Sequence, residues 1–258
     1  MNKFTLLSLI VVLAAIAAGL AFPSDASANN AWGNYHWART SNPFTLKLGD
    51  NVNSTWQTYF EMASADWTKS NVLNTNIVSG GTGRRRCRPT NGSVEVCNYA
   101  YGQNGWLGLA QIWISGSHIT QGVVKVNDTY FNMAAYNNIN ERQHVMCQEI
   151  GHTLGLDHQD ESGASLNTCM DYYYNTSNSD TKSTHPNQHD YDQLAAIYAH
   201  LDSTTTLRSV PEQMQNADLE ARSAWGREIR ASANKRAAIF ERDFGGGHKV
   251  FTFVIWVQ

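Results

Sequence analysis

The sequence has little charge, and the little it has is nearly balanced. Charged side chains make up 16% of the 258 residues, and the formal net charge is -3. So mild a charge predicts neither a nucleic acid nor a membrane surface as a partner, because binding to either usually needs a strongly basic face. We expect a monomer that has no nucleic-acid partner and, once exported, no membrane partner.

Long apolar runs are missing everywhere except at the N-terminus. There Lys3 precedes an apolar run over 4–22, and a small-residue motif follows that ends at Ala28. This pattern is typical of an export signal, so we predict a signal peptide over 1–28 and a secreted mature chain. The run is long enough to span a bilayer if it is not cleaved, which leaves a membrane-anchored protein as the alternative.

The chain has only four cysteines. In an exported protein an even number of cysteines predicts disulfides, and four cysteines allow three pairings. Cys87 and Cys97 flank an Asn-Gly turn pair, so we expect them to clamp a hairpin. Cys147 and Cys169 would then form the second disulfide. Free thiols are the alternative.

The hydrophobic pattern predicts both helices and strands, which places the chain in the α+β class. Apolar residues at helical spacing predict helices over 53–67, 140–154 and 187–201. Short apolar runs predict strands over 44–48, 72–77, 107–114 and 119–126. The segment 79–101 is rich in Gly, Asn and Arg and predicts a loop and hairpin. Its charge run, which we expect to be solvated, is Arg84, Arg85, Arg86 and Arg88.

The composition changes after Asp202. A Ser/Thr-rich stretch followed by Val-Pro predicts a linker over 203–211. Beyond it we predict a charged helix over 217–231 and two strands, the last over 250–257. The main domain would therefore cover 29–202, and residues 203–258 would form a small appended α+β tail to which the sequence assigns no role.

The segment from Gln148 to His158 has the spacing of a metal site. Gln148 and His152 are four residues apart, so on a helix their side chains lie one above the other. Glu149 points about a quarter-turn away, where it can hold a water molecule as a general base. Gly155 can take the left-handed backbone conformation that ends a helix and returns His158 to the same place. Chance or core packing is the structural alternative.

This pattern resembles that of the metzincin zinc peptidases, H-E-x-x-H-x-x-G-x-x-H followed by a methionine turn. Over 32–201 the order of elements also looks like that family, close to its matrixin and astacin branches. The departure is Gln148, which stands where the family has its first histidine. The residues that match are Glu149, His152, Gly155, His158 and, in the turn, Met170.

The resemblance implies a metzincin-like zincin fold, in which a mixed twisted sheet carries an active-site helix and a C-terminal helix. It also implies a Zn²⁺ cofactor held by His152 and His158, with Gln148 as a weaker third ligand. Glu149 would be the general base. Tyr172, two residues after the turn methionine, would be the candidate for an oxyanion and zinc role, and an ordinary buried tyrosine is the alternative.

By the same resemblance, a substrate backbone would bind along 107–114 at the edge of the sheet by strand addition. The chain would then be a secreted zinc metalloendopeptidase. A metzincin-fold pseudo-enzyme that acts as a binding module is the second hypothesis, because Gln148 is a poorer ligand than histidine. A purely structural zinc is disfavoured, since structural sites are closed by four protein ligands. His144, one turn before Gln148, lies too far up the helix to share the ion.

Overall fold

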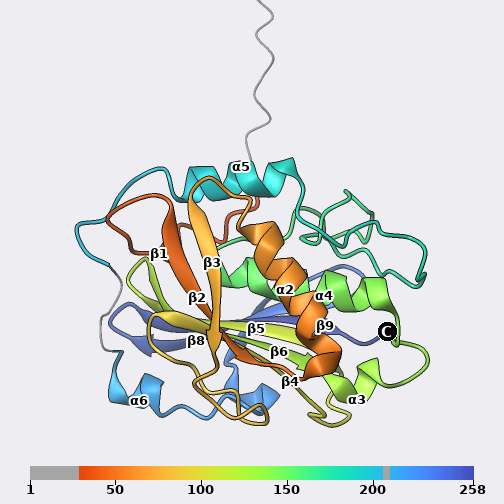
Figure 1. Cartoon of the computed structure of the whole chain (residues 1–258). Coiled ribbons are helices and arrows are strands. Elements are labelled where there is room, and N and C mark those ends of the chain that lie inside the picture. Colours follow the sequence, from red (N-terminus) through yellow and green to blue (C-terminus); the bar gives the residue numbers. More distant parts are fainter. Residues whose placement is uncertain (1–28, 206–209) are drawn as a thin grey trace, which may run out of the picture.

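A mixed sheet of nine strands forms the centre of the molecule, and helices pack on it (Figure 1). The structure is a computed structural model that describes residues 29–205 and 210–258. The predicted signal peptide, 1–28, lies outside the described residues. Within the described ranges, no helix combines the length and the apolar character that crossing a bilayer requires. The chain is thus an α+β protein, as predicted.

The strands pair mainly in parallel in one half of the sheet and in antiparallel fashion in the other. In sequence order they are β1 (His36–Trp37), β2 (Phe44–Asn51), β3 (Leu73–Ser79), β4 (Ser93–Tyr99), β5 (Trp106–Ser115), β6 (His118–Asn127), β7 (Arg227–Ala231), β8 (Ala237–Gly245) and β9 (His248–Trp256). Across the sheet the order is β3-β2-β4-β6-β5-β9-β8-β7, with β1 beside β6. The pairs β3–β2, β2–β4 and β4–β6 are parallel. The pairs β6–β5, β5–β9, β9–β8 and β8–β7 are antiparallel.

Two helices, α2 (Ser54–Trp67) and α4 (Ile139–Thr153), lie side by side against the sheet (Figure 1). Each begins at an asparagine whose side chain accepts backbone N–H groups of the first turn: Asn53 for α2 and Asn138 for α4. Trp67 Nε1 donates to the Cys147 carbonyl at 3.1 Å and joins the two helices. Both helices are confirmed to within a residue of the predicted ends.

The third long helix, α5 (Gln188–Ile197), is shorter than predicted. It begins in a capping box of Asn187 and Asp190 but ends four residues before the predicted boundary at 201. The chain then turns, and the Asp202 amide donates to the Arg39 carbonyl at 2.8 Å. The shorter elements are α3 (Asp128–Phe131), α6 (Glu212–Gln215) and the 3-10 turn η1 (Arg222–Ala224).

Both predicted disulfides are present, Cys87–Cys97 and Cys147–Cys169. The predicted hairpin around the first is wrong. The segment before β4 is a loop, and β4 pairs in parallel with β2 and β6. Cys87–Cys97 therefore ties a surface loop to a central strand. The four arginines of the loop are exposed, as predicted.

The tail is not a separate unit. Strand β9 pairs with β5 along its whole length, from Trp106 opposite Trp256 to Ser115 opposite His248, so β7 to β9 continue the main sheet. The predicted helix over 217–231 is also wrong, because that segment holds η1 and β7. Apolar side chains of 210–225 cover the sheet face opposite to α4, where they form a second core with β5, β8 and β9.

This pairing overturns the predicted substrate edge. Strand β5, which contains 107–114, has β6 on one side and β9 on the other, so it is an interior strand. The prediction failed because an alternating apolar strand has the same sequence pattern whether or not a neighbour is bound to its edge. In this structure the chain's own C-terminal strand occupies the place expected for substrate.

Candidate metal centre

Helix α4 carries the first half of the candidate site and ends at Thr153, two residues before Gly155. This glycine has φ +95°, and an added Cβ would lie 2.4 Å from the Tyr35 carbonyl oxygen. Only glycine fits there, for both conformational and steric reasons. The Gly155 carbonyl accepts the Trp32 amide at 2.8 Å, which fixes the turn against the N-terminal segment.

The turn brings His158 back against His152. The centroids of the two imidazole rings are 4.4 Å apart and the rings are tilted by 75°. His152 Nδ1 lies 3.0 Å from the Leu156 carbonyl oxygen, which can only accept a hydrogen bond. The proton therefore resides on Nδ1, and Nε2 remains as the donor atom for a metal.

Gln148 lies one turn before His152 on α4, and only half of its amide is hydrogen-bonded. Its Nε2 donates to the Asp171 carbonyl at 2.9 Å, whereas Oε1 is buried and makes no hydrogen bond to any described residue. His144 Nε2 lies 3.0 Å from the same Asp171 carbonyl oxygen. The His144 ring is thus bound to the backbone, in keeping with its exclusion from the ligand set.

Glu149 is a fully buried carboxyl group. Neither of its oxygens has a hydrogen-bond partner in the described part of the chain. It faces β5, where a Cβ added to Gly108 would lie 2.9 Å from Glu149 Oε1. Burial raises the pKa of Glu149 well above its ordinary value, because the charged form loses its hydration.

Met170 packs against helix α4. An added Cβ at Gly151 would lie 2.5 Å from Met170 Sδ, so the sulfur packs directly on α4 beside His152. The disulfide Cys147–Cys169 ends next to Met170 and fastens this segment to the same helix. The predicted place of Met170 beneath a metal stays a prediction.

Tyr172 contacts His158. Its hydroxyl lies 2.7 Å from His158 Nδ1, and Asp157 Oδ1 lies 3.3 Å from the same nitrogen. With a proton on Nδ1, both oxygens have a donor and Nε2 remains free for a metal. In this conformation Tyr172 orients a candidate ligand, and the predicted role at an oxyanion stays a prediction.

Burial favours the neutral form of both histidines. Burial lowers the pKa of His152 most, and the nearby His158 lowers it further. Burial also lowers the pKa of His158, although Asp157 partly opposes the shift. Burial raises the pKa of Asp157 itself, but hydrogen bonds with His158 and Arg230 and the charge of Arg230 more than offset it and hold the pKa below its usual value. Neutral imidazoles are the form that binds metals.

The site is closed by the C-terminal strands. Gln148, Glu149, His152, His158 and Tyr172 all have side chains that are no more than 2% exposed. Phe253 of β9 stacks on the His152 ring with centroids 4.3 Å apart. Arg230 of β7 pairs with Asp157 and, at 3.2 Å, with Glu161. Asp157, His158 and Glu161 also have donor atoms within 4.8 Å of one another, but Arg230 already supplies positive charge there.

The donor set fits zinc. His152 and His158 each have one ring nitrogen committed to a carbonyl or carboxylate, and Gln148 offers an unpartnered carbonyl oxygen. Two imidazoles and an oxygen are donors that zinc accepts, with a fourth position left open. Buried oxygens without partners cost about 1–3 kcal/mol each, so a cation and a water molecule would relieve a real penalty at Gln148 and Glu149.

Comparisons with known proteins give only distant similarities. No protein-family model and no curated protein matches the chain. Fourteen chains of solved structures are similar to it. One is a structure of myroilysin, at 11% identity and a TM-score of 0.36, covering 62% of this chain and 82% of that one. Another is high choriolytic enzyme 1, a hatching enzyme zinc protease from the medaka fish Oryzias latipes, at 10% identity and a TM-score of 0.35, covering 64% and 94%. At such values neither protein's activity transfers to this chain.

Three neighbours of the site were not predicted from the sequence. Asp157 directly precedes His158, so its contact with that ring could have been predicted from the sequence. Arg230 and Phe253 come from strands more than seventy residues away along the chain, and no local pattern connects them to α4. They became neighbours of the site through strand pairing alone.

Proposed function

We propose that the chain is a zinc-dependent metalloendopeptidase, with Gln148, His152 and His158 as the metal ligands and Glu149 as the general base. The observation that carries this proposal is the set of buried, unpartnered oxygens of Gln148 and Glu149 on the helix that also carries His152, whose ring contacts His158. A core built only for packing would avoid such groups, because each one lowers stability.

Each residue has a defined task in peptide hydrolysis. Zinc in a site of this kind supplies Lewis acidity, which polarises a carbonyl group and makes water more acidic. Glu149 accepts the proton of the attacking water on a carboxylate oxygen and returns it to the leaving amine. Tyr172 and Asp157 hold the His158 ring by its Nδ1, and the Leu156 carbonyl holds His152 in the same way. Phe253 and Gly108 exclude bulk water from Glu149 and His152.

The covered edge of the sheet implies that this conformation is latent. A substrate strand would need the side of β5 that β9 now occupies. Peptides would therefore reach Glu149 only when β7 to β9 move. Arg230 is a polar contact that holds this cover against the site, through Asp157 and Glu161.

The test uses the mature full-length protein, a denatured protein as substrate, and zinc analysis. Glu149→Gln should lower chelator-sensitive cleavage at least about 100-fold and leave the zinc content unchanged. Glu61→Gln, the same change at an exposed position of α2, should do neither. Arg230→Ala should raise cleavage by loosening the cover, whereas Arg222→Ala, which breaks an exposed pair with Glu228, should not.

A binding module without catalysis is the second candidate, and the closed site favours it. Its signature is zinc bound by the wild-type protein with no cleavage in any of these variants, nor in Gln148→His. Cleavage that persists in Glu149→Gln at the wild-type rate would instead rule out Glu149 as the base.

A further inference from the structure

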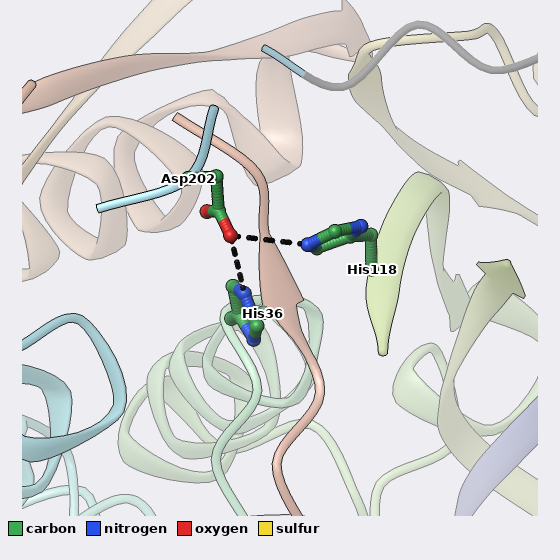
Figure 2. A group of neighbouring side chains, drawn as sticks. All are labelled: His36, His118 and Asp202. Carbon is green, nitrogen blue, oxygen red and sulfur yellow. Dashed lines mark hydrogen bonds and ion pairs between the residues drawn. The ribbon is translucent and has the colours of Figure 1, made fainter. Parts of the chain in front are cut away.

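Four side chains from three distant segments form a second cluster, which shares no residue with the candidate metal centre. They are His36 of β1, His118 at the start of β6, and His200 and Asp202 in the turn after α5. Figure 2 shows the rings of His36 and His118 directed at the Asp202 carboxylate. The two histidines are direct partners in the parallel pairing of β1 with β6, which places them side by side.

Four separations between the donor atoms are close to those of a tetrahedral metal site. Asp202 Oδ1 lies 3.2 Å from His118 Nε2, 3.4 Å from His36 Nε2 and 3.8 Å from His200 Nε2. His200 Nε2 lies 3.1 Å from His36 Nε2. Donors held about 2.0–2.1 Å from a tetrahedral zinc ion lie roughly 3.3 Å from one another. The measured separations bracket that value.

The surrounding contacts orient the donors. Arg39 binds the other carboxylate oxygen, Oδ2, through its backbone N–H at 3.1 Å and its guanidinium at 2.9 Å, which leaves Oδ1 for the rings. His36 Nδ1 lies 2.7 Å from the Asn34 carbonyl oxygen, so the proton of a neutral ring is on Nδ1. His36 Nε2 therefore turns a lone pair toward Asp202 Oδ1. This outer contact is the kind that fixes metal-binding histidines.

A lone pair that faces a carboxylate oxygen at 3.4 Å is repelled by it unless positive charge lies between the two atoms. A hydrogen bond from His200 Nε2, 3.1 Å from His36 Nε2, would satisfy the His36 ring alone. A divalent metal ion would satisfy all four donors together, and three imidazoles with one carboxylate are a donor set that zinc accepts.

We propose that His36, His118, His200 and Asp202 hold a structural Zn²⁺ ion. Four protein donors close such a site, in contrast to the candidate metal centre, whose donor set leaves a position for water. The ion fastens β1 and the turn between β5 and β6 to the segment after α5, directly before residues 203–211. The His200 side chain is 56% exposed and that of His118 is 27% exposed, which leaves a path for the ion from solvent.

The experiment measures zinc per chain in the mature full-length protein after incubation with Zn²⁺ and gel filtration. His118→Gln with His200→Gln should lose one equivalent of zinc, and the rise in Tm that added zinc produces, roughly 5–10 °C, should shrink. The matched control is His185→Gln with His248→Gln, two histidines outside the cluster, and it should keep the wild-type content. His152→Gln should remove only the equivalent at the candidate metal centre.

These variants separate the two sites. Suppose that the wild-type protein binds a single zinc ion, that the His152→Gln protein still binds it, and that the cluster variant does not. The structural site then stands, although the proposed function fails. Wild-type zinc content in a folded cluster variant would overturn the inference. The single variant His200→Gln changes a largely exposed ring and should therefore leave the fold intact. It should weaken zinc binding at least about tenfold. X-ray absorption of the His152→Gln protein should show three nitrogens and one oxygen around zinc, and any other ligand set would count against the site.

Discussion

Phe253 of β9 stacks on His152 of α4 with an interplanar angle of 11° and a centroid separation of 4.3 Å. The contact joins a candidate metal ligand to a strand that enters the sheet more than ninety residues later in the chain. Because Phe253 is also opposite Ala110 of β5, one residue covers the imidazole and belongs to the strand that pairs with β5.

Replacing Phe253 by alanine should open this contact. We expect Phe253→Ala to lower the free energy of unfolding by about 3–5 kcal/mol, as for other buried phenylalanines, and to expose the His152 ring. Urea unfolding measures the first effect, and modification of His152 by diethyl pyrocarbonate, followed by mass spectrometry, measures the second. Phe240→Ala in the second core should cost similar stability and leave His152 protected. Equal protection of His152 in both variants would show that Phe253 is not the cover.

The residue at position 148 should set the affinity for zinc. Gln148→His replaces a carbonyl oxygen by an imidazole and should tighten zinc binding at least about tenfold. Gln148→Ala removes the donor and should weaken binding relative to wild type. Competition with a chromophoric chelator gives the order, expected to be His, then Gln, then Ala. Equal affinity for all three would remove Gln148 from the ligand set.

Arg236 and Glu141 form a fully buried ion pair at 2.6 Å between the C-terminal strands and α4. Arg236→Met should lower the free energy of unfolding by about 3–5 kcal/mol, because it leaves Glu141 buried without its partner. Lys235→Met, at the exposed neighbouring position, should change it by less than about 0.5 kcal/mol. Replacing both members of the pair by methionine should lower the free energy of unfolding by less than Arg236→Met alone. An equal or larger loss would show that the unpaired charge of Glu141 is not the cause of the destabilisation.

Asp66 should contribute a pH-dependent part of the stability. Burial alone would raise the pKa of this carboxyl group, but hydrogen bonds from His185 and Lys69 more than offset it and lower the pKa below its ordinary value. A carboxyl group with a lowered pKa stabilises the fold above its unfolded pKa of about 3.9 and loses that contribution as the pH falls through the folded value. The difference in unfolding free energy between wild type and Asp66→Asn should therefore narrow from about pH 6 to about pH 3. Lys69→Met should reduce the same acid dependence, and a constant difference across this range would contradict the assignment.

Much of the fold could be read from local pattern. The helices α2 and α4 were predicted closely because their apolar period and their asparagine caps are properties of neighbouring residues. Strand β4 was missed because buried polar residues such as Glu95 and Asn98 interrupt its apolar pattern. The segment 217–231 was predicted as a helix from its composition, and pairing of β7 with β8 overrode that preference.

The sequence by itself determined that Gln148, Glu149 and His152 lie on one helix and that His158 returns to His152, because a helical turn and a helix-ending glycine are encoded within eleven residues. Only the tertiary structure decided that β9 covers β5 and that Arg230 and Phe253 close the site. It also decided that His36, His118 and His200 each come close to Asp202. The physical reason is that strand pairing is made by backbone groups common to all residues. Which distant segments become neighbours therefore depends on how the whole core packs.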